Sequence, residues 1–303
     1  MGGRLTSAAL VLCSLTGLAG CGSQRRGHCN EQPSGCPRSV YAMDVAMLQR
    51  GLARRQLHVL DLRDEAAYDA GHVPGAVHLD REAVRAVVGG VAGQVAPARQ
   101  VTAALTAAGV QDGDSVVAYD ADNGPAAARL LWTLIYYGWS PGRVHVLDGG
   151  FAAWEEAGGA MDTTEPPREP RRPLTLAPPS NARRVDAPWV SKHLGTGQVA
   201  LLDARGHEEY LAGHIPGALH VPWESTRSGT RFVDDDALVS LYGEALAAPT
   251  VITYCDTGLR ASLLWLTLKM LGHADVRVYD GSWSEWNARP DLPKVVGDEP
   301  GAV

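Results

Sequence analysis

The chain has 303 residues, of which 45% are hydrophobic and 20% are charged, and its formal net charge is −7. This composition is typical of a globular protein long enough for two domains. The negative net charge, without a basic stripe along the chain, argues against nucleic acid as a partner. The five cysteines are too few and too unevenly placed for a disulfide scaffold.

The first 20 residues predict an export signal. Arg4 precedes an apolar run that starts at Leu5, and small residues continue up to Cys21. The apolar run is too short for a permanent membrane span. The stretch LAGC, which ends at Cys21, resembles a bacterial lipobox, and this implies that residues 1–20 are removed and that Cys21 is lipidated. We therefore expect a protein that is lipid-anchored to the cell envelope, with its folded part in the periplasm. An ordinary signal peptide cut nearby is the alternative.

Residues 21–40 are polar and rich in glycine and proline, which predicts a tether. Cys29 and Cys36 lie close together in this tether, and an oxidising compartment would allow them to pair. The sequence leaves open whether they do. Metal binding is less favoured, because only His28 lies close by.

Two pairs of segments repeat along the chain. LDLRDEAAYDAGHVPGAVHL (60–79) and LDARGHEEYLAGHIPGALHV (202–221) are identical at eleven of twenty positions. VLDGGFAAW (146–154) and VYDGSWSEW (278–286) follow in the same order. This arrangement indicates a tandem duplication.

The repeats divide the chain into two domains. We expect the first over residues 41–158 and the second over residues 185–296. Residues 159–184 lack an apolar period and contain the stretch EPPREPRRP, which predicts a proline-rich linker.

Each copy alternates short apolar strands with helices. In the second copy, VALLDA (199–204) and TVITY (250–254) are typical of buried strands, and RASLLWLTLKMLG (260–272) predicts an amphipathic helix. Strands that alternate with helices predict an α/β fold, in which each domain has a mostly parallel sheet with helices on both faces.

A cysteine lies at the predicted end of a strand in the second copy only. Cys255 follows TVITY, whereas Asp120 occupies the same place in the first copy. Active sites of parallel α/β sheets lie beyond the carboxyl ends of the strands. Backbone N–H groups, the helix dipole and Arg260 would stabilise an anionic sulfur there, and Gly258 permits the tight turn. The pattern predicts an activated nucleophile; the alternative is a buried structural cysteine.

Three motifs make the chain similar to a known family. AGHIPGA (212–218), CDTGLR (255–260) and VYDGSWSEW (278–286) resemble signatures of the tandem-domain rhodaneses, the thiosulfate and 3-mercaptopyruvate sulfurtransferases. In that family a loop cysteine carries sulfur as a persulfide, and the first domain usually lacks the cysteine. The resemblance implies that Cys255 is catalytic and that the first domain is inactive, with Asp120 in place of cysteine.

The resemblance also implies a reaction. Cys255 would take the outer sulfur of thiosulfate or 3-mercaptopyruvate, release sulfite or pyruvate, and pass the sulfur to cyanide or a thiol. The loop residues expected to hold the persulfide with their N–H groups are Asp256, Thr257, Gly258, Leu259 and Arg260. We expect no cofactor, no metal site and a monomer.

Other residues have two interpretations. Arg205 matches an arginine that the family uses to bind the anionic substrate, but Arg63 repeats it in the inactive copy, so a structural salt bridge is the alternative. Some mercaptopyruvate enzymes link a first-domain aspartate and histidine to a loop serine, and Asp61, His72 and Thr257 match this triad weakly. The histidines of the repeated block occur in both copies, which argues against a metal site: His72, His78, His214 and His220.

The loop does not decide the sulfur donor. Thiosulfate-preferring loops often carry two basic residues after the cysteine, whereas mercaptopyruvate enzymes tend to have small residues there. This loop has Asp256 and Thr257, and we expect Asp256 to repel a dianion while Arg260 offsets it. A phosphatase would need the pattern C-x5-R, which is one residue longer than the spacing from Cys255 to Arg260. A non-catalytic module that binds or delivers sulfur at the membrane remains the other alternative.

Overall fold

The computed structural model describes residues 38–54, 57–121, 124–167 and 174–301. Three expectations lie outside these residues: the signal peptide, the lipidation of Cys21, and the pairing of Cys29 with Cys36. Within the described residues, no helix is both long enough and apolar enough to cross a membrane.

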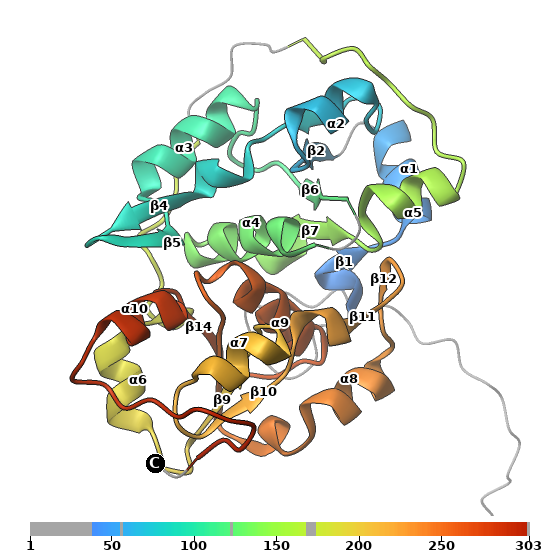
Figure 1. Cartoon of the computed structure of the whole chain (residues 1–303). Helices are drawn as coiled ribbons and strands as arrows, with labels where there is room; N and C mark the ends of the chain where they lie inside the picture. Colours follow the sequence, from blue (N-terminus) through green and yellow to red (C-terminus); the bar gives the residue numbers. More distant parts are fainter. Residues whose placement is uncertain (1–37, 55–56, 122–123, 168–173, 302–303) are drawn as a thin grey trace, which may run out of the picture.

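The first domain is built on a parallel five-stranded sheet (Figure 1). The strands, in sheet order, are β1 (Ala42–Met43), β7 (Val144–Leu147), β6 (Val116–Tyr119), β2 (His58–Asp61) and β3 (Val77–His78). The helices are α1 (Val45–Ala53), α2 (Glu65–Ala70), α3 (Ala98–Ala107), α4 (Pro125–Tyr136) and α5 (Gly150–Glu156), with short 3-10 helices η1 (Arg38–Val40), η2 (Arg81–Val84) and η3 (Pro141–Arg143). An antiparallel hairpin joins β4 (Arg85–Val88) to β5 (Val91–Val95).

The second domain repeats this plan. Its parallel sheet has the order β10 (Ala218–His220), β9 (Val199–Asp203), β13 (Thr250–Tyr254), β14 (Val276–Tyr279) and β8 (Arg184–Val185). Its helices are α6 (Ala187–His193), α7 (His207–Ala212), α8 (Asp235–Tyr242), α9 (Leu259–Met270) and α10 (Ser282–Ala288), with η4 (Trp223–Thr226) and η5 (Gly243–Ala247). A short hairpin joins β11 (Arg227–Ser228) to β12 (Arg231–Phe232). The predicted α/β fold with two tandem parallel sheets is confirmed.

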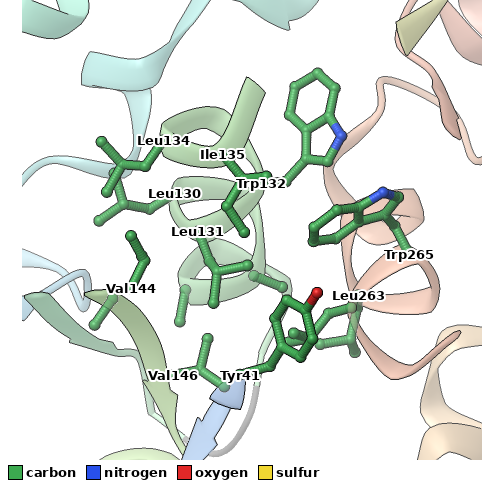
Figure 2. Close-up of a cluster of buried hydrophobic side chains, with 14 of the residues drawn as sticks. Tyr41, Leu130, Leu131, Trp132, Leu134, Ile135, Val144, Val146, Leu263 and Trp265 are labelled. Atoms are coloured by element: carbon green, nitrogen blue, oxygen red, sulfur yellow. The ribbon is translucent and has the colours of Figure 1, made fainter. Parts of the chain in front are cut away.

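Helices α4 and α9 pack against each other where the domains meet. Side chains of both helices, including Trp132 and Trp265, belong to one continuous apolar core (Figure 2). Every residue of α9 from Ala261 to Met270 is buried. The prediction of an amphipathic helix here is wrong, because the face expected in solvent packs against the first domain.

Each domain sends its hairpin to the other domain. The N–H of Val95, at the end of β5, donates to Oδ2 of Asp280 at 2.8 Å. Likewise, the N–H of Phe232, in β12, donates to Oδ1 of Asp148 at 3.0 Å. Asp148 and Asp280 follow β7 and β14 in the repeated VLDGGFAAW and VYDGSWSEW segments. The two contacts are therefore equivalent, and they relate the domains by approximate two-fold symmetry.

Candidate active site

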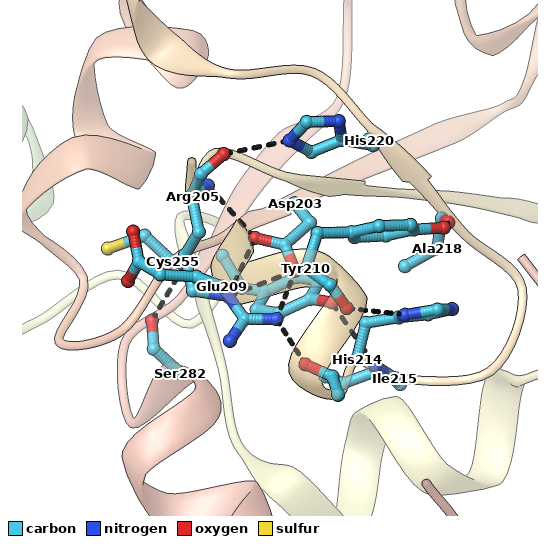
Figure 3. Close-up of polar contacts among 12 residues, drawn as sticks. Asp203, Arg205, Glu209, Tyr210, His214, Ile215, Ala218, His220, Cys255 and Ser282 are labelled. Carbon is cyan, nitrogen blue, oxygen red and sulfur yellow. Dashed lines mark hydrogen bonds and ion pairs between the residues drawn. The ribbon is translucent and has the colours of Figure 1, made fainter. Parts of the chain in front are cut away.

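Cys255 lies in the turn between β13 and α9. The side chain is 1% exposed, and Gly258, with a φ of 78°, forms the left-handed residue that starts the helix. The N–H of Cys255 donates to Oγ of Ser282 at 3.3 Å (Figure 3). The carbonyl of Cys255 accepts from the N–H of Trp283 at 2.9 Å. The first residues of α10 therefore fix the backbone of Cys255 through two hydrogen bonds.

Ser282, which accepts a hydrogen bond from the Cys255 N–H, is a residue of the site that the sequence did not single out. Its φ of 54° makes it the one non-glycine residue with a positive φ in the described part of the chain. Gly150 holds the matching place in the first domain, with a φ of 58°. A side chain in this conformation costs free energy. In this conformation the Ser282 hydroxyl donates to the Tyr279 carbonyl at 2.8 Å and accepts from the N–H of Cys255.

The loop after Cys255 presents unused hydrogen-bond donors. None of the N–H groups from Asp256 to Ala261 has a partner among the described residues. The first domain shows what such a loop binds. There the Asp120 carboxylate accepts N–H groups of Gly124 at 2.7 Å, Ala126 at 3.1 Å and Ala127 at 3.1 Å. The arrangement therefore suits an anionic group, which in the second domain would be a charged sulfur on Cys255.

Arg260 is neutralised by a residue that the sequence did not predict. Its two terminal nitrogens bind the Glu209 carboxylate of α7 at 2.5 and 2.7 Å. These hydrogen bonds raise the pKa of Arg260 and lower the pKa of Glu209. Because the pKa of Glu209 is lowered, the pair is intact at neutral pH and is lost only as the pH falls through that pKa. The charge of Cys255 also contributes to the raised pKa of Arg260, so Arg260 and the backbone N–H groups both act on an anionic sulfur.

The first domain supports the loop directly. Arg129 of α4 is fully buried and donates to the carbonyl of Gly258 at 3.2 Å and to Oδ1 of Asp280 at 2.7 Å. The hairpin adds a second contact, in which Nη2 of Arg85 donates to Oγ1 of Thr257 at 3.1 Å. A Cβ on Gly93 would lie 2.7 Å from Cβ of Thr257, so glycine is required for this approach.

A cavity of about 290 Å³ opens where the domains meet, and it reaches the loop at Leu259. Trp223 of the second domain forms part of its wall. The charged residues that line it come from the first domain: Arg63, Asp64, Arg81 and Asp120. The cavity therefore lies over the Asp120 loop of the first domain, and Cys255 is not part of its lining.

Arg205 is held in an ion pair. Its side chain is 2% exposed and binds Oδ2 of Asp203 at 2.6 Å and the carbonyl of Gly213 at 2.6 Å. Arg63 makes the same contacts with Asp61 and Gly71. These contacts are those of the structural salt bridge that was the alternative interpretation of Arg205. Its Nη1 atom, in contrast, has no hydrogen-bond partner among the described residues. Binding of the substrate by Arg205 stays a prediction.

The suggested triad does not form. Asp61 accepts from Arg63 and from the Tyr119 hydroxyl, and the ring of His72 stacks on Tyr68 at 3.9 Å. Thr257 is bound by Arg85 instead. The other repeated histidines are structural in the same way: His214 stacks on Tyr210, and His78 and His220 bond to the carbonyls of Arg63 and Arg205. Among the described residues, no cluster of acidic, histidine or cysteine side chains could hold a metal ion.

Asp256 is anchored beside the nucleophile. Its Oδ1 accepts from Oγ of Ser284 at 3.0 Å, and its carbonyl accepts from the Ser284 N–H at 3.1 Å. No cation pairs with this carboxylate among the described residues. Its negative charge therefore lies one residue from Cys255 without a formal counter-charge.

We expect Asp256→Asn to lower the KM for thiosulfate. An asparagine oxygen still accepts from Ser284, so the loop is preserved while one negative charge is removed. Solvent reduces the effect to about threefold at low ionic strength, and salt reduces it further. The gain for singly charged 3-mercaptopyruvate is expected to be smaller. Equal KM values for both variants at low salt would show that the Asp256 carboxylate does not act on the donor.

The structure is that of a protein of two tandem α/β domains, with a buried cysteine in the loop after a central strand of the second domain. A model of the rhodanese-like domain matches residues 44–157 and 186–289. The chain therefore belongs to the rhodanese-like family.

Relatives agree with this assignment. A putative thiosulfate sulfurtransferase of Mycolicibacterium smegmatis is 32% identical over 260 residues, which are 77% of this chain and 89% of the relative. A probable 3-mercaptopyruvate sulfurtransferase of Pseudomonas aeruginosa is 32% identical over 285 residues, which are 86% of this chain and 99% of the relative. The predicted sulfurtransferase class is confirmed.

The solved structures show the same fold. The crystal structure of SseA from Escherichia coli, which is described as a 3-mercaptopyruvate sulfotransferase, superimposes with a TM-score of 0.72 at 24% identity. The match covers 81% of this chain and 99% of that chain.

Proposed function

We propose that this chain transfers a sulfane sulfur from thiosulfate or 3-mercaptopyruvate, through a persulfide on Cys255, to cyanide or a thiol. The observation that carries the proposal is the ring of unused N–H groups beside Cys255. The same ring in the first domain is filled by the Asp120 carboxylate. Relatives named for both donors support either substrate.

The reaction follows from these positions. The Cys255 thiolate attacks the outer sulfur of thiosulfate, the S–S bond of the donor breaks, and sulfite leaves with the bonding electron pair. The new terminal sulfur carries one negative charge, which the loop N–H groups stabilise. Cyanide then attacks this sulfur and leaves as thiocyanate, and the Cys255 thiolate is restored. No cofactor is required for either step.

Mass spectrometry after treatment with thiosulfate tests the proposal. The peptide that contains Cys255 is expected to gain one sulfur atom and to lose it when cyanide is added. Steady-state kinetics with thiosulfate and 3-mercaptopyruvate, measured side by side, would then identify the preferred donor. Absence of the added sulfur with both donors would contradict the proposal. Hydrolysis of an aryl phosphate would instead support the phosphatase alternative.

We also propose that the protein acts as a monomer anchored to the cell envelope by a lipid on Cys21. The support is the lipobox-like LAGC stretch after an apolar run of export-signal length. The wild type is expected to fractionate with membranes and to be released by mild detergent, whereas Cys21→Ala should yield unlipidated precursor or soluble protein. Labelling with a fatty-acid analogue checks this directly. An unlabelled wild type would refute the lipid anchor and leave export open.

A further inference from the structure

The arginines around the active loop differ in how far their charges are neutralised. Three are each paired with a carboxylate: Arg260 with Glu209, Arg205 with Asp203, and Arg129 with Asp280. Arg85 is paired only with Glu82, whose side chain is 56% exposed. Water and salt weaken that pair, because its carboxylate faces solvent. Arg85 and Arg260 are therefore the two arginines of this group whose partners face solvent, since the Glu209 side chain is 43% exposed, and the partner of Arg85 is the more exposed of the two.

Arg85 is also confined against the loop. The side chain is 13% exposed, and its Nη2 donates to Oγ1 of Thr257 at 3.1 Å. A Cβ on Gly93 would lie 2.7 Å from this nitrogen. The Nε of Arg85 is buried and has no partner among the described residues. A buried donor without a partner costs free energy, so the guanidinium is held here at a cost to stability.

The contact also directs the Thr257 hydroxyl. Because Oγ1 accepts from Arg85, its own proton is free to be donated elsewhere, and it has no acceptor among the described residues. Thr257 lies two residues after Cys255 and next to Asp256, whose carboxylate has no counter-charge. Arg85 thus places a cation and a directed hydroxyl donor at the second residue after Cys255.

We propose that Arg85, contributed by the inert domain, is a specificity-determining residue that holds the negative end of the sulfur donor at the active loop. It offsets Asp256 and, through Thr257, supplies a directed donor. The inference rests on the proposed function, since it names the residue that recognises the donor's charge. It also explains how a loop whose first two residues after the cysteine are not basic accepts an anion.

Kinetics give the first test. Arg85→Gln is expected to raise the KM for thiosulfate about tenfold and that for 3-mercaptopyruvate about threefold, because the first carries two negative charges and the second one. The difference should shrink as salt is added. Arg85→Lys keeps the charge and should recover part of the loss. Arg99→Gln, which removes an exposed positive charge from the same domain, is the matched control and should leave both KM values unchanged.

Alkylation of Cys255 gives a test that needs no turnover. Iodoacetate is an anion and iodoacetamide is neutral, so the ratio of their rates on the Cys255 peptide reports the local charge. Arg85→Gln should lower this ratio severalfold at low salt, and Arg85→Lys should keep it near the wild-type value. Glu82→Gln, at an exposed site, should raise the ratio because it frees Arg85 from its carboxylate. Glu82 also lies 4.0 Å from Nε of Arg81, so the same change in an Arg81→Gln background is the control.

The outcomes separate the two proposals. A ratio unchanged in both Arg85→Gln and Glu82→Gln at low salt would overturn the role of Arg85, even if sulfur transfer is normal. If Arg85→Gln fails to fold, the Glu82→Gln arm still decides. A Cys255 that accepts no sulfur in the wild type would refute the proposed function, whereas the alkylation ratio would still measure the charge of Arg85.

Discussion

Cys255→Ser is expected to abolish sulfur transfer, whereas changes at Asp120 leave it in place. A serine oxygen at this position cannot form the persulfide that links the two half-reactions. Asp120→Ala removes three hydrogen bonds to backbone N–H groups, so it should lower the free energy of unfolding by about 1–3 kcal/mol without touching the chemistry. Turnover with thiosulfate and cyanide, together with urea unfolding, measures both effects.

The matched variant is Asp120→Asn, which keeps an acceptor at the same place and should lose less stability than Asp120→Ala. More than a few per cent of wild-type turnover in Cys255→Ser would show that another group carries the sulfur. Loss of turnover in a folded Asp120→Asn protein would show that the first domain takes part in the chemistry.

Arg129→Met is expected to lower both the free energy of unfolding and kcat. The change leaves the Asp280 carboxylate buried with weaker compensation, because only the Arg184 side chain at 3.1 Å and the Val95 N–H remain. Breaking a buried pair in this way costs about 3 kcal/mol. The carbonyl of Gly258 also loses one of its donors and keeps only the Ser262 hydroxyl at 3.0 Å, so kcat should fall as the loop is held less firmly.

Arg129→Lys and the exposed Arg50→Met separate these contributions. The lysine keeps the charge but cannot bind Gly258 and Asp280 together, so it should lose activity more than stability. Arg50→Met, at an exposed site on α1, should change neither quantity. Wild-type unfolding and kcat in Arg129→Met would show that the α4 contact is dispensable.

The repeated segments and the order of strands and helices predicted the fold, because period and turn residues are local signals. The same signals located Cys255 at the end of a strand and Asp120 at the matching place. The sequence did not predict the role of Glu209. This residue pairs with Arg260, which is fifty-one positions away, and its local sequence is that of an ordinary exposed helix. The one sequence signal for Ser282 is that it replaces a glycine, since the first repeat has Gly150 at the matching position.

The support from the first domain could not be read from the sequence. Arg129 and Gly258 are 129 positions apart, and the matching fifth residue of α9 is Leu263, so the repeat gives no hint of the contact. The approach of Gly93 to Thr257 likewise depends on how the domains are placed. An amphipathic pattern was expected for residues 260–272 because one-dimensional periodicity cannot reveal a second buried face.

The shared core of α4 and α9 has a consequence for the history of the chain. The first copy has Asp120 in place of the cysteine, so it has no covalent step of its own to perform. Yet α9 is buried from Ala261 to Met270 partly by α4, so a lone second domain would expose an apolar surface to water. We therefore expect either domain, when produced alone, to aggregate, and this gives a reason to keep the first copy that is independent of the reaction.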